Sequence, residues 1–196
     1  GQAGALGAIA LAGYLVGTLA GRPTALRLRI PPTLDLGMAM IAVSLLACAW
    51  NGGFWWLMAW RGVSGIGAGL VMALAGPAAQ ASVPPRLRGI AGGIVLSGIA
   101  SGIAFGALLV PAVLPMGLPA TWLLLAGAVT LLWLVGRLRW PDMTLTGAST
   151  TPIPRARLLI LTYGLHSAGM VPPMVYMADL AVRGRGLGMT AGAAAW

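Results

Sequence analysis

Long apolar stretches, separated by short polar or proline-rich segments, run along the whole chain. A helix needs about 20 apolar residues to cross the hydrocarbon core of a bilayer, and six stretches meet this length while a seventh is cut short. They cover residues 4–21, 35–51, 54–76, 89–114, 119–138 and 157–178, and the seventh begins at about 187. Strands of a membrane barrel would instead alternate in polarity over about 10 residues. The pattern predicts an all-α membrane protein, a polytopic helix bundle of six spans plus a truncated seventh.

The segments between these stretches carry turn-forming residues. Residues 22–32 are polar and contain three prolines, 51–53 read Asn-Gly-Gly, and 84–88 and 115–119 are proline-rich. The longest connector, 139–156, holds Asp142, a Thr/Ser cluster and several prolines. It is the predicted linker between a first part, 1–138, and the beginning of a second part, 157–196.

Most arginines lie in or beside alternate connectors. The first, third and fifth connectors and their flanks hold Arg22, Arg27, Arg29, Arg86, Arg88, Arg137, Arg139, Arg155 and Arg157. The second and fourth hold no basic residue, so the arginine-bearing connectors are expected in the cytoplasm; Arg183 and Arg185 in the sixth depart from the pattern. This orientation puts the first residue on the outer side, so we expect a fragment that lacks at least one helix at its start and more at its end. No signal peptide is visible.

The composition excludes several classes of protein. Of the 196 residues, 59% are hydrophobic and 8% charged, against about 25% charged in soluble domains, and the mean hydropathy is +0.91. The net charge of +9 comes from arginines spread along the chain rather than gathered in a patch, so no nucleic-acid partner is expected. The one cysteine, Cys48, rules out a disulfide framework. A soluble enzyme or secreted scaffold is excluded, and no metal or cofactor is expected.

Three strings of residues resemble the major facilitator superfamily of transporters. Residues 60–69, WRGVSGIGAG, resemble its fourth-helix signature, an arginine followed by a glycine-rich face. Residues 161–169, LTYGLHSAG, and 92–111 resemble the seventh and fifth helices of its YbfB/YjiJ branch. Two positions depart from family motifs. Gly21 stands where the loop motif after the second helix has Asp. Ile103 follows Gly102 where the antiporter motif of the fifth helix, Gly-x-x-x-Gly-Pro, has Pro. The resemblance spans nearly the whole chain, from the second helix to the start of the eighth.

The resemblance implies fold, function and location. Members of the superfamily have two six-helix halves joined by a cytoplasmic loop, with the solute site between them near the midplane. It therefore implies a secondary transporter of a small solute working by alternating access, with proton coupling as an open option. The expected partners are the lipid bilayer, a small solute and H⁺. The expected form is a monomer, multi-pass in the cell membrane of a bacterium.

Arg61 and His166 are the leading candidates for the solute site. Arg61 lies about seven residues inside a span, where a charge is costly and by default faces the bundle interior or a water-filled cavity. Four roles remain open for it: binding an anionic solute, gating, a structural tie to backbone carbonyls or to the missing first helix, and extension to the outer surface. Ser64, in the same motif, is a further cavity candidate.

His166, the single histidine, lies near the predicted midplane and could take up a proton near neutral pH. Tyr163, Ser167 and Met170 lie beside it on the helix. A neutral histidine that bonds to another helix is the alternative. Pro172 and Pro173 must bend or break this helix.

Other residues receive structural interpretations. Gly65 and Gly69, and likewise Gly98, Gly102 and Gly106, repeat at four-residue spacing, which favours close helix packing in lipid. Asp35 is expected to cap the span at 35–51, the third helix in the family's numbering. Trp50, Trp55, Trp56 and Trp60 are expected to anchor the outer turn.

Two other functions remain as alternatives. Ser101 and His166 faintly resemble the serine and histidine of a rhomboid-type intramembrane protease, although Ile99 replaces the glycine expected two residues before the serine. A membrane scaffold or sensor without transport is the second alternative.

Overall fold

The computed structural model describes residues 2–50, 52–138 and 140 and, further along, residues 158, 161, 162, 164–166, 169, 184 and 186. The chain divides into two units, Gly1–Leu145 and Thr146–Trp196. The described part of the first unit contains five long helices, with two short 3₁₀ helices, η1 (Pro85–Leu87) and η2 (Leu114–Met116), in its connectors. The long helices are α1 (Gln2–Leu28), α2 (Ile30–Cys48), α3 (Gly53–Ala81), α4 (Arg88–Val113) and α5 (Leu118–Arg137).

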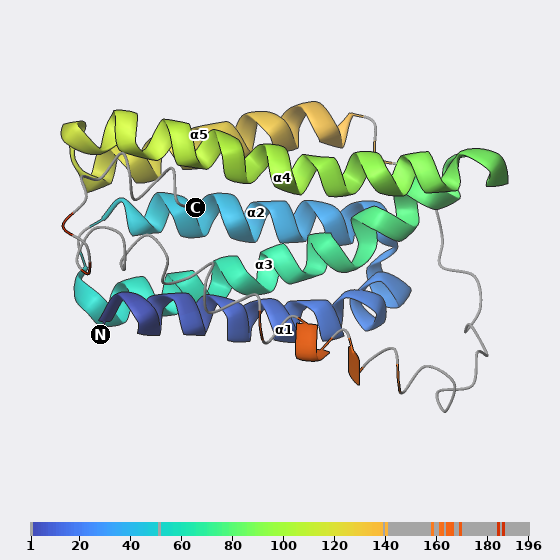
Figure 1. Ribbon diagram of the computed structural model, residues 1–196, viewed down its shortest axis with the longest axis horizontal. Helices are drawn as coiled ribbons and strands as arrows, with labels where there is room; N and C mark the ends of the chain where they lie inside the picture. The colour runs from blue at the N-terminus through green and yellow to red at the C-terminus, as the bar shows by residue number, and fades with distance from the viewer. Residues whose placement is uncertain are drawn as a thin grey trace. The chain divides into compact units, whose positions relative to one another are not determined.

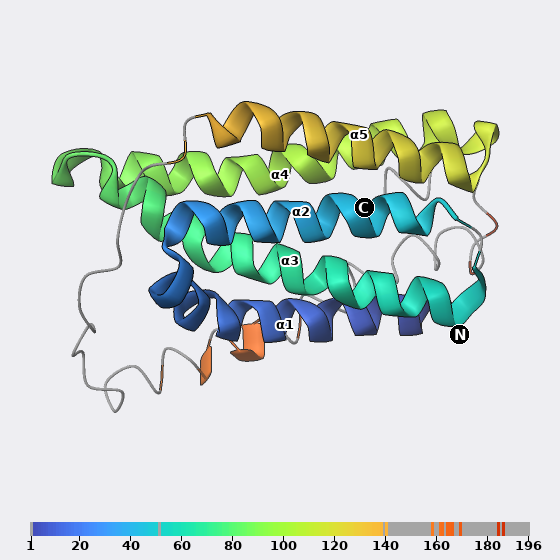
Figure 2. The same cartoon turned by 180° about the vertical axis from the view of Figure 1, so that it is seen from behind.

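Successive helices of the first unit run in opposite directions, with connectors at alternate ends (Figures 1 and 2). Helix α1 packs most extensively on α3, and α2 contacts both α3 and α5. Helix α4 contacts chiefly α3 and has no buried residue. The order across the unit is therefore α1, α3, α2, α5, with α4 beside α3 and, to a smaller extent, α5.

All five helices are long and apolar enough to cross a bilayer. This confirms the membrane helix bundle and five of the predicted spans. The sixth and seventh predicted spans, at 157–178 and from 187, fall mostly outside the described residues.

The predicted loop at 22–32 is wrong. Helix α1 continues through Pro23 to Leu28, and Arg29 alone separates it from α2. The N–H of Arg29 still donates to the carbonyl of Ala25 at 2.9 Å, and its φ of 71° turns the chain. Arg22 and Arg27 lie on a helix end rather than in a loop, because backbone hydrogen bonding can continue beyond the apolar stretch into the headgroup layer.

The predicted capping role of Asp35 is also wrong. Helix α2 begins at Ile30, with prolines in its first turn, so Asp35 lies in the second turn. Its carboxylate instead accepts hydrogen bonds from two indole groups near the end of α5, those of Trp133 and Trp140.

Glycines let the backbones of α1 and α3 touch. A Cβ built on Gly65 or Gly69 of α3 would collide with the carbonyl oxygens of Ala10 and Tyr14, respectively, on α1. A Cβ on Gly17 of α1 would collide in the same way with the carbonyl oxygen of Ile66. Small residues at such spacing are the usual device for close helix approach in lipid, and the packing role predicted for Gly65 and Gly69 is confirmed.

The second glycine series behaves differently. No described atom lies within 4 Å of a Cβ built on Gly98, Gly102 or Gly106. The close packing predicted for this face of α4 stays a prediction.

A small core joins three helices at one end of the first unit. Its buried members come from the end of α1, the start of α2 and the end of α3: Ala25, Ile30, Leu34, Leu74 and Ala78. The connector after α1 and the connector after α3 therefore lie at the same end. The alternation of arginine-bearing connectors predicted this placement.

Candidate functional site

Arg61 lies well inside α3. It is eight residues beyond Gly53, the start of the helix, which is about 12 Å at 1.5 Å per residue. The 29 residues of α3 extend about 43 Å, close to the thickness of a bilayer with its headgroups, about 40–45 Å. Arg61 is therefore a few ångströms inside the hydrocarbon layer, and its side chain is half-buried.

An aromatic ring holds the Arg61 guanidinium. Its Cζ lies 5.8 Å from the centroid of the Trp122 ring on α5, within range of a cation–π interaction. Asp35, the one acid among the described residues, pairs with Arg137 through Nε and Oδ2 at 3.5 Å. Within the described part of the chain, the charge of Arg61 is thus stabilised by a ring quadrupole and has no carboxylate to neutralise it.

Ser64 lies one turn after Arg61 and is tied to it through the backbone. Its hydroxyl donates to the carbonyl oxygen of Arg61 at 2.9 Å, and the residue is only 8% exposed. It shares a helix face with Gly67, whose Cβ position lies 2.6 Å from the carbonyl oxygen of Gly37 on α2. Ser64 therefore lies between α3 and α2, whereas the Arg61 guanidinium points to α5.

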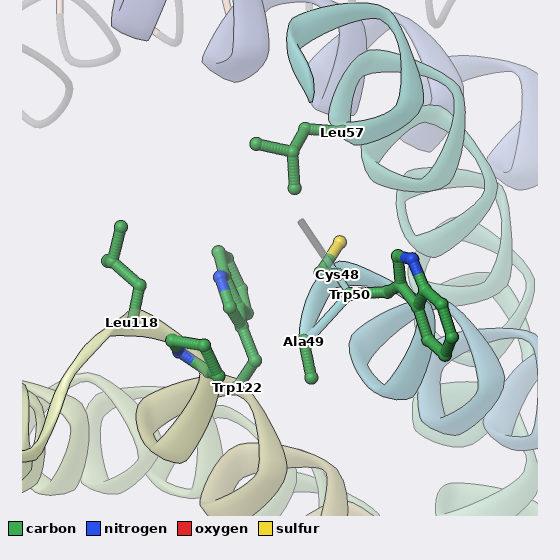
Figure 3. A pocket seen from close by; sticks show the side chains of 7 residues that line it. Cys48, Ala49, Trp50, Leu57, Leu118 and Trp122 are labelled. Atoms are coloured by element: carbon green, nitrogen blue, oxygen red, sulfur yellow. The ribbon is translucent and has the colours of Figure 1, made fainter. Parts of the chain in front are cut away.

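A cavity of about 270 Å³ adjoins the same tryptophan. Figure 3 shows it where the end of α2 and the starts of α3 and α5 meet. Its lining comprises Cys48, Ala49, Trp50, Leu57, Leu118, Pro119 and Trp122. The walls are mainly apolar, with the Cys48 thiol as a weak polar group. Trp122 lines the cavity and also contacts the guanidinium of Arg61, so the Arg61 charge lies next to a mainly apolar cavity.

Sequence reasoning missed Trp122 and Cys48 as cavity residues. A charge inside a span needs a group that stabilises it. Tryptophan rings can do so through a cation–π interaction, so the tryptophans of the sequence were the residues to consider. Nothing in the spacing distinguishes Trp122 from the other aromatic residues expected in the interfacial belt, because the pairing depends on how α5 docks.

Comparison with models of known protein families identifies the family of this chain. The model of the family described as "Uncharacterised MFS-type transporter YbfB" matches residues 1–196. The chain belongs to this family. It is therefore a multi-pass membrane transporter of the major facilitator type, as its motifs predicted. No curated protein and no solved structure matches the chain.

One departure of this transporter from the family's loop motif has a structural reason. Gly21, in place of the usual Asp, lies inside α1, and a Cβ there would lie 2.7 Å from the Cβ of Ala73 on α3. Any larger side chain would force these two helices apart.

The candidates in the second part of the transporter are only partly described. His166 is helical and exposed within its unit, and Tyr163, Ser167 and Met170 lie outside the described residues. A shared cavity for Arg61 and His166 therefore remains a prediction.

Ser101 is the residue on which the alternative of an intramembrane serine protease depends. It lies on the exposed surface of α4, where its hydroxyl donates to the carbonyl oxygen of Ser97 at 2.8 Å. Membership of a transporter family favours transport over both the protease and the scaffold alternatives.

Proposed function

We propose that this transporter moves a small anionic solute by secondary active transport with alternating access, and that Arg61 contacts the solute or the gate in front of it. The observation that carries the proposal is the unneutralised charge of Arg61 inside the hydrocarbon layer. Among the described residues its contact is the neutral ring of Trp122, while the one carboxylate is engaged by Arg137.

The energetics favour a functional role for this charge. An arginine costs about 2.5–3.5 kcal/mol at the centre of a span on insertion scales, and less at the shallower depth of Arg61. A cation–π contact returns about 0.5–2 kcal/mol, depending on how far the pair is desolvated. The remaining cost is offset when an anionic solute approaches, because burial strengthens the attraction between opposite charges.

The proposal extends to the second part of the chain. His166 is the single histidine in the sequence, and imidazole is a common proton-exchanging group in proteins. We propose that it exchanges the coupling proton, and that it and Arg61 border one cavity together with Ser64, Tyr163, Ser167 and Met170. The membrane concerned is the cell membrane of a bacterium.

Thermal-shift screening against a panel of small organic carboxylates and phosphates tests the anion site. A ligand that binds the folded state raises the melting temperature, by an amount that grows with its concentration over its dissociation constant. We expect at least one such anion to raise it in the parent protein. Arg61→Ala should lose the shift, whereas Arg86→Ala, which removes an exposed arginine of the third connector, should keep it. A shift that persists unchanged in Arg61→Ala contradicts the proposed site.

Proteoliposome uptake of the same anion tests proton coupling. We expect His166→Ala to flatten the dependence of uptake on pH, because alanine cannot titrate. If Arg61→Ala and His166→Ala both leave uptake and its pH dependence unchanged, the proposed roles of both residues are wrong.

A further inference from the structure

A cluster at the end of α5 surrounds one carboxylate of α2. Oδ1 of Asp35 accepts hydrogen bonds from Nε1 of Trp133 at 2.7 Å and from Nε1 of Trp140 at 3.0 Å. Oδ2 lies 3.5 Å from Nε of Arg137. A single side chain of α2 therefore holds three donors that all come from the end of α5 or from just beyond it.

The three donors lie close together along the chain. Trp133 and Arg137 are four residues apart and so share one face of α5. Helix α5 ends at Arg137, so Trp140 lies past the helix end, where its indole reaches the same carboxylate. The carboxylate thus holds the helix and also the first part of the segment that follows it.

Trp140 is fixed by packing as well as by its N–H. Its side chain packs against the core formed by the end of α1, the start of α2 and the end of α3. A Cβ on Gly136 would lie 3.4 Å from its ring, an ordinary contact distance, so the ring lies against α5. An indole has a donor and no acceptor, and Asp35 supplies the acceptor for both rings.

The Asp35 carboxylate is itself about three-quarters shielded, with 26% of its side chain exposed. An acid in the second turn of a membrane helix is costly unless it is paired. It does not cap α2, which begins five residues earlier at Ile30. The hydrogen bonds and the ion pair of its side chain join it to the end of α5 and to Trp140.

We propose that Asp35, Trp133, Arg137 and Trp140 form a clamp that fastens the beginning of the connector between the two halves to the N-terminal half. In this clamp Asp35 is a positioning residue. The clamp keeps the end of α5 and Trp140 moving with α1–α3. The inference rests on the two-half mechanism proposed above, but the clamp itself can be measured in the absence of transport.

Pulsed electron-spin distance measurements on the full-length protein test the clamp. In a Cys48→Ala background, spin labels on Leu28→Cys and Leu138→Cys, at positions 48% and 85% exposed, report the clamped end. Labels on Leu46→Cys and Leu118→Cys, at positions 50% and 63% exposed, report the opposite end of α2 and α5. We expect one narrow distance distribution at each pair in the parent protein.

Asp35→Ala should broaden the distribution at the clamped end and add a longer distance, while the opposite end stays narrow. Asp35→Asn, which keeps an acceptor oxygen for the indoles but loses the charge that attracts Arg137, should give an intermediate width. Trp140→Phe, which keeps the ring and loses the N–H, should also broaden the clamped end.

Two outcomes overturn the proposal. An unchanged narrow distribution at the clamped end of Asp35→Ala means that the carboxylate does not hold the connector. Equal broadening at both ends means that Asp35 supports the whole bundle rather than a local clamp. Neither outcome depends on whether the protein transports a solute, so a failure of the clamp is distinct from a failure of the proposed function.

Discussion

The contact between α1 and α3 makes a quantitative prediction for Gly69→Ala. The new methyl group would collide with the carbonyl oxygen of Tyr14 and lie 2.6 Å from the backbone nitrogen of Thr18. Ordinary contacts between such atoms are about 3.5 Å, so the two helices must separate by about 1 Å. Both neighbours are backbone atoms, which cannot rotate out of the way.

The expected cost follows from two opposing effects. Overpacking of a well-packed contact costs up to about 3 kcal/mol, whereas replacing glycine by alanine in a helix gains about 1 kcal/mol. The net destabilisation is about 2 kcal/mol, which corresponds to a fall of about 4–8 °C in the melting temperature for a chain of this size.

Gly102→Ala on α4 is the matched control. No described atom lies within 4 Å of a Cβ at this position, so the gain in helix propensity should act alone and raise the melting temperature slightly. Cys48, the single cysteine, is 4% exposed, and a thiol-reactive fluorophore can therefore follow unfolding in detergent. A Gly69→Ala protein that melts at or above the temperature of Gly102→Ala would refute the packing argument.

Two more substitutions test the packing of the first unit. Gly21→Asp should lower the melting temperature because its Cβ meets Ala73 at 2.7 Å, and adding Ala73→Gly should restore part of the loss; no restoration would mean that the collision is not the cause. Trp56→Phe removes the donor that bonds the carbonyl oxygen of Ala47 at 2.8 Å and should cost about 1 kcal/mol in the same melting assay. Trp55→Phe, at a position 78% exposed, should cost less, and equal losses would contradict the assigned hydrogen bond.

The sequence predicted the number and order of the first five helices because each apolar stretch must satisfy its own backbone hydrogen bonds in lipid. It also predicted that the first and third connectors lie at the same end of the first unit, since arginine marks alternate connectors. It placed the end of α1 too early, because polarity marks the edge of the hydrocarbon layer, whereas hydrogen bonding marks the end of a helix. Helix α1 therefore continues through Pro23 to Leu28.

The candidate site was predictable only in part. The charge of Arg61 stood out because arginine is rare within spans. Its contact with Trp122 and the engagement of Asp35 by Trp133 and Trp140 join residues far apart in sequence. Such pairings depend on how α5 docks against α2 and α3, and no local periodicity encodes this docking.

Topology mapping by thiol labelling tests most directly the claim that the helices cross the bilayer in alternating directions. Single cysteines in a Cys48→Ala background can replace Leu28 and Leu87 at one end of the first unit and Trp50 and Met116 at the other, positions between 39% and 76% exposed. A membrane-impermeant maleimide added to intact cells should label Trp50→Cys and Met116→Cys, and should label Leu28→Cys and Leu87→Cys only after the membrane is opened. Labelling of Leu28→Cys and Leu87→Cys from opposite faces would contradict the topology and, with it, the proposed positions of Arg61 and the Asp35 clamp.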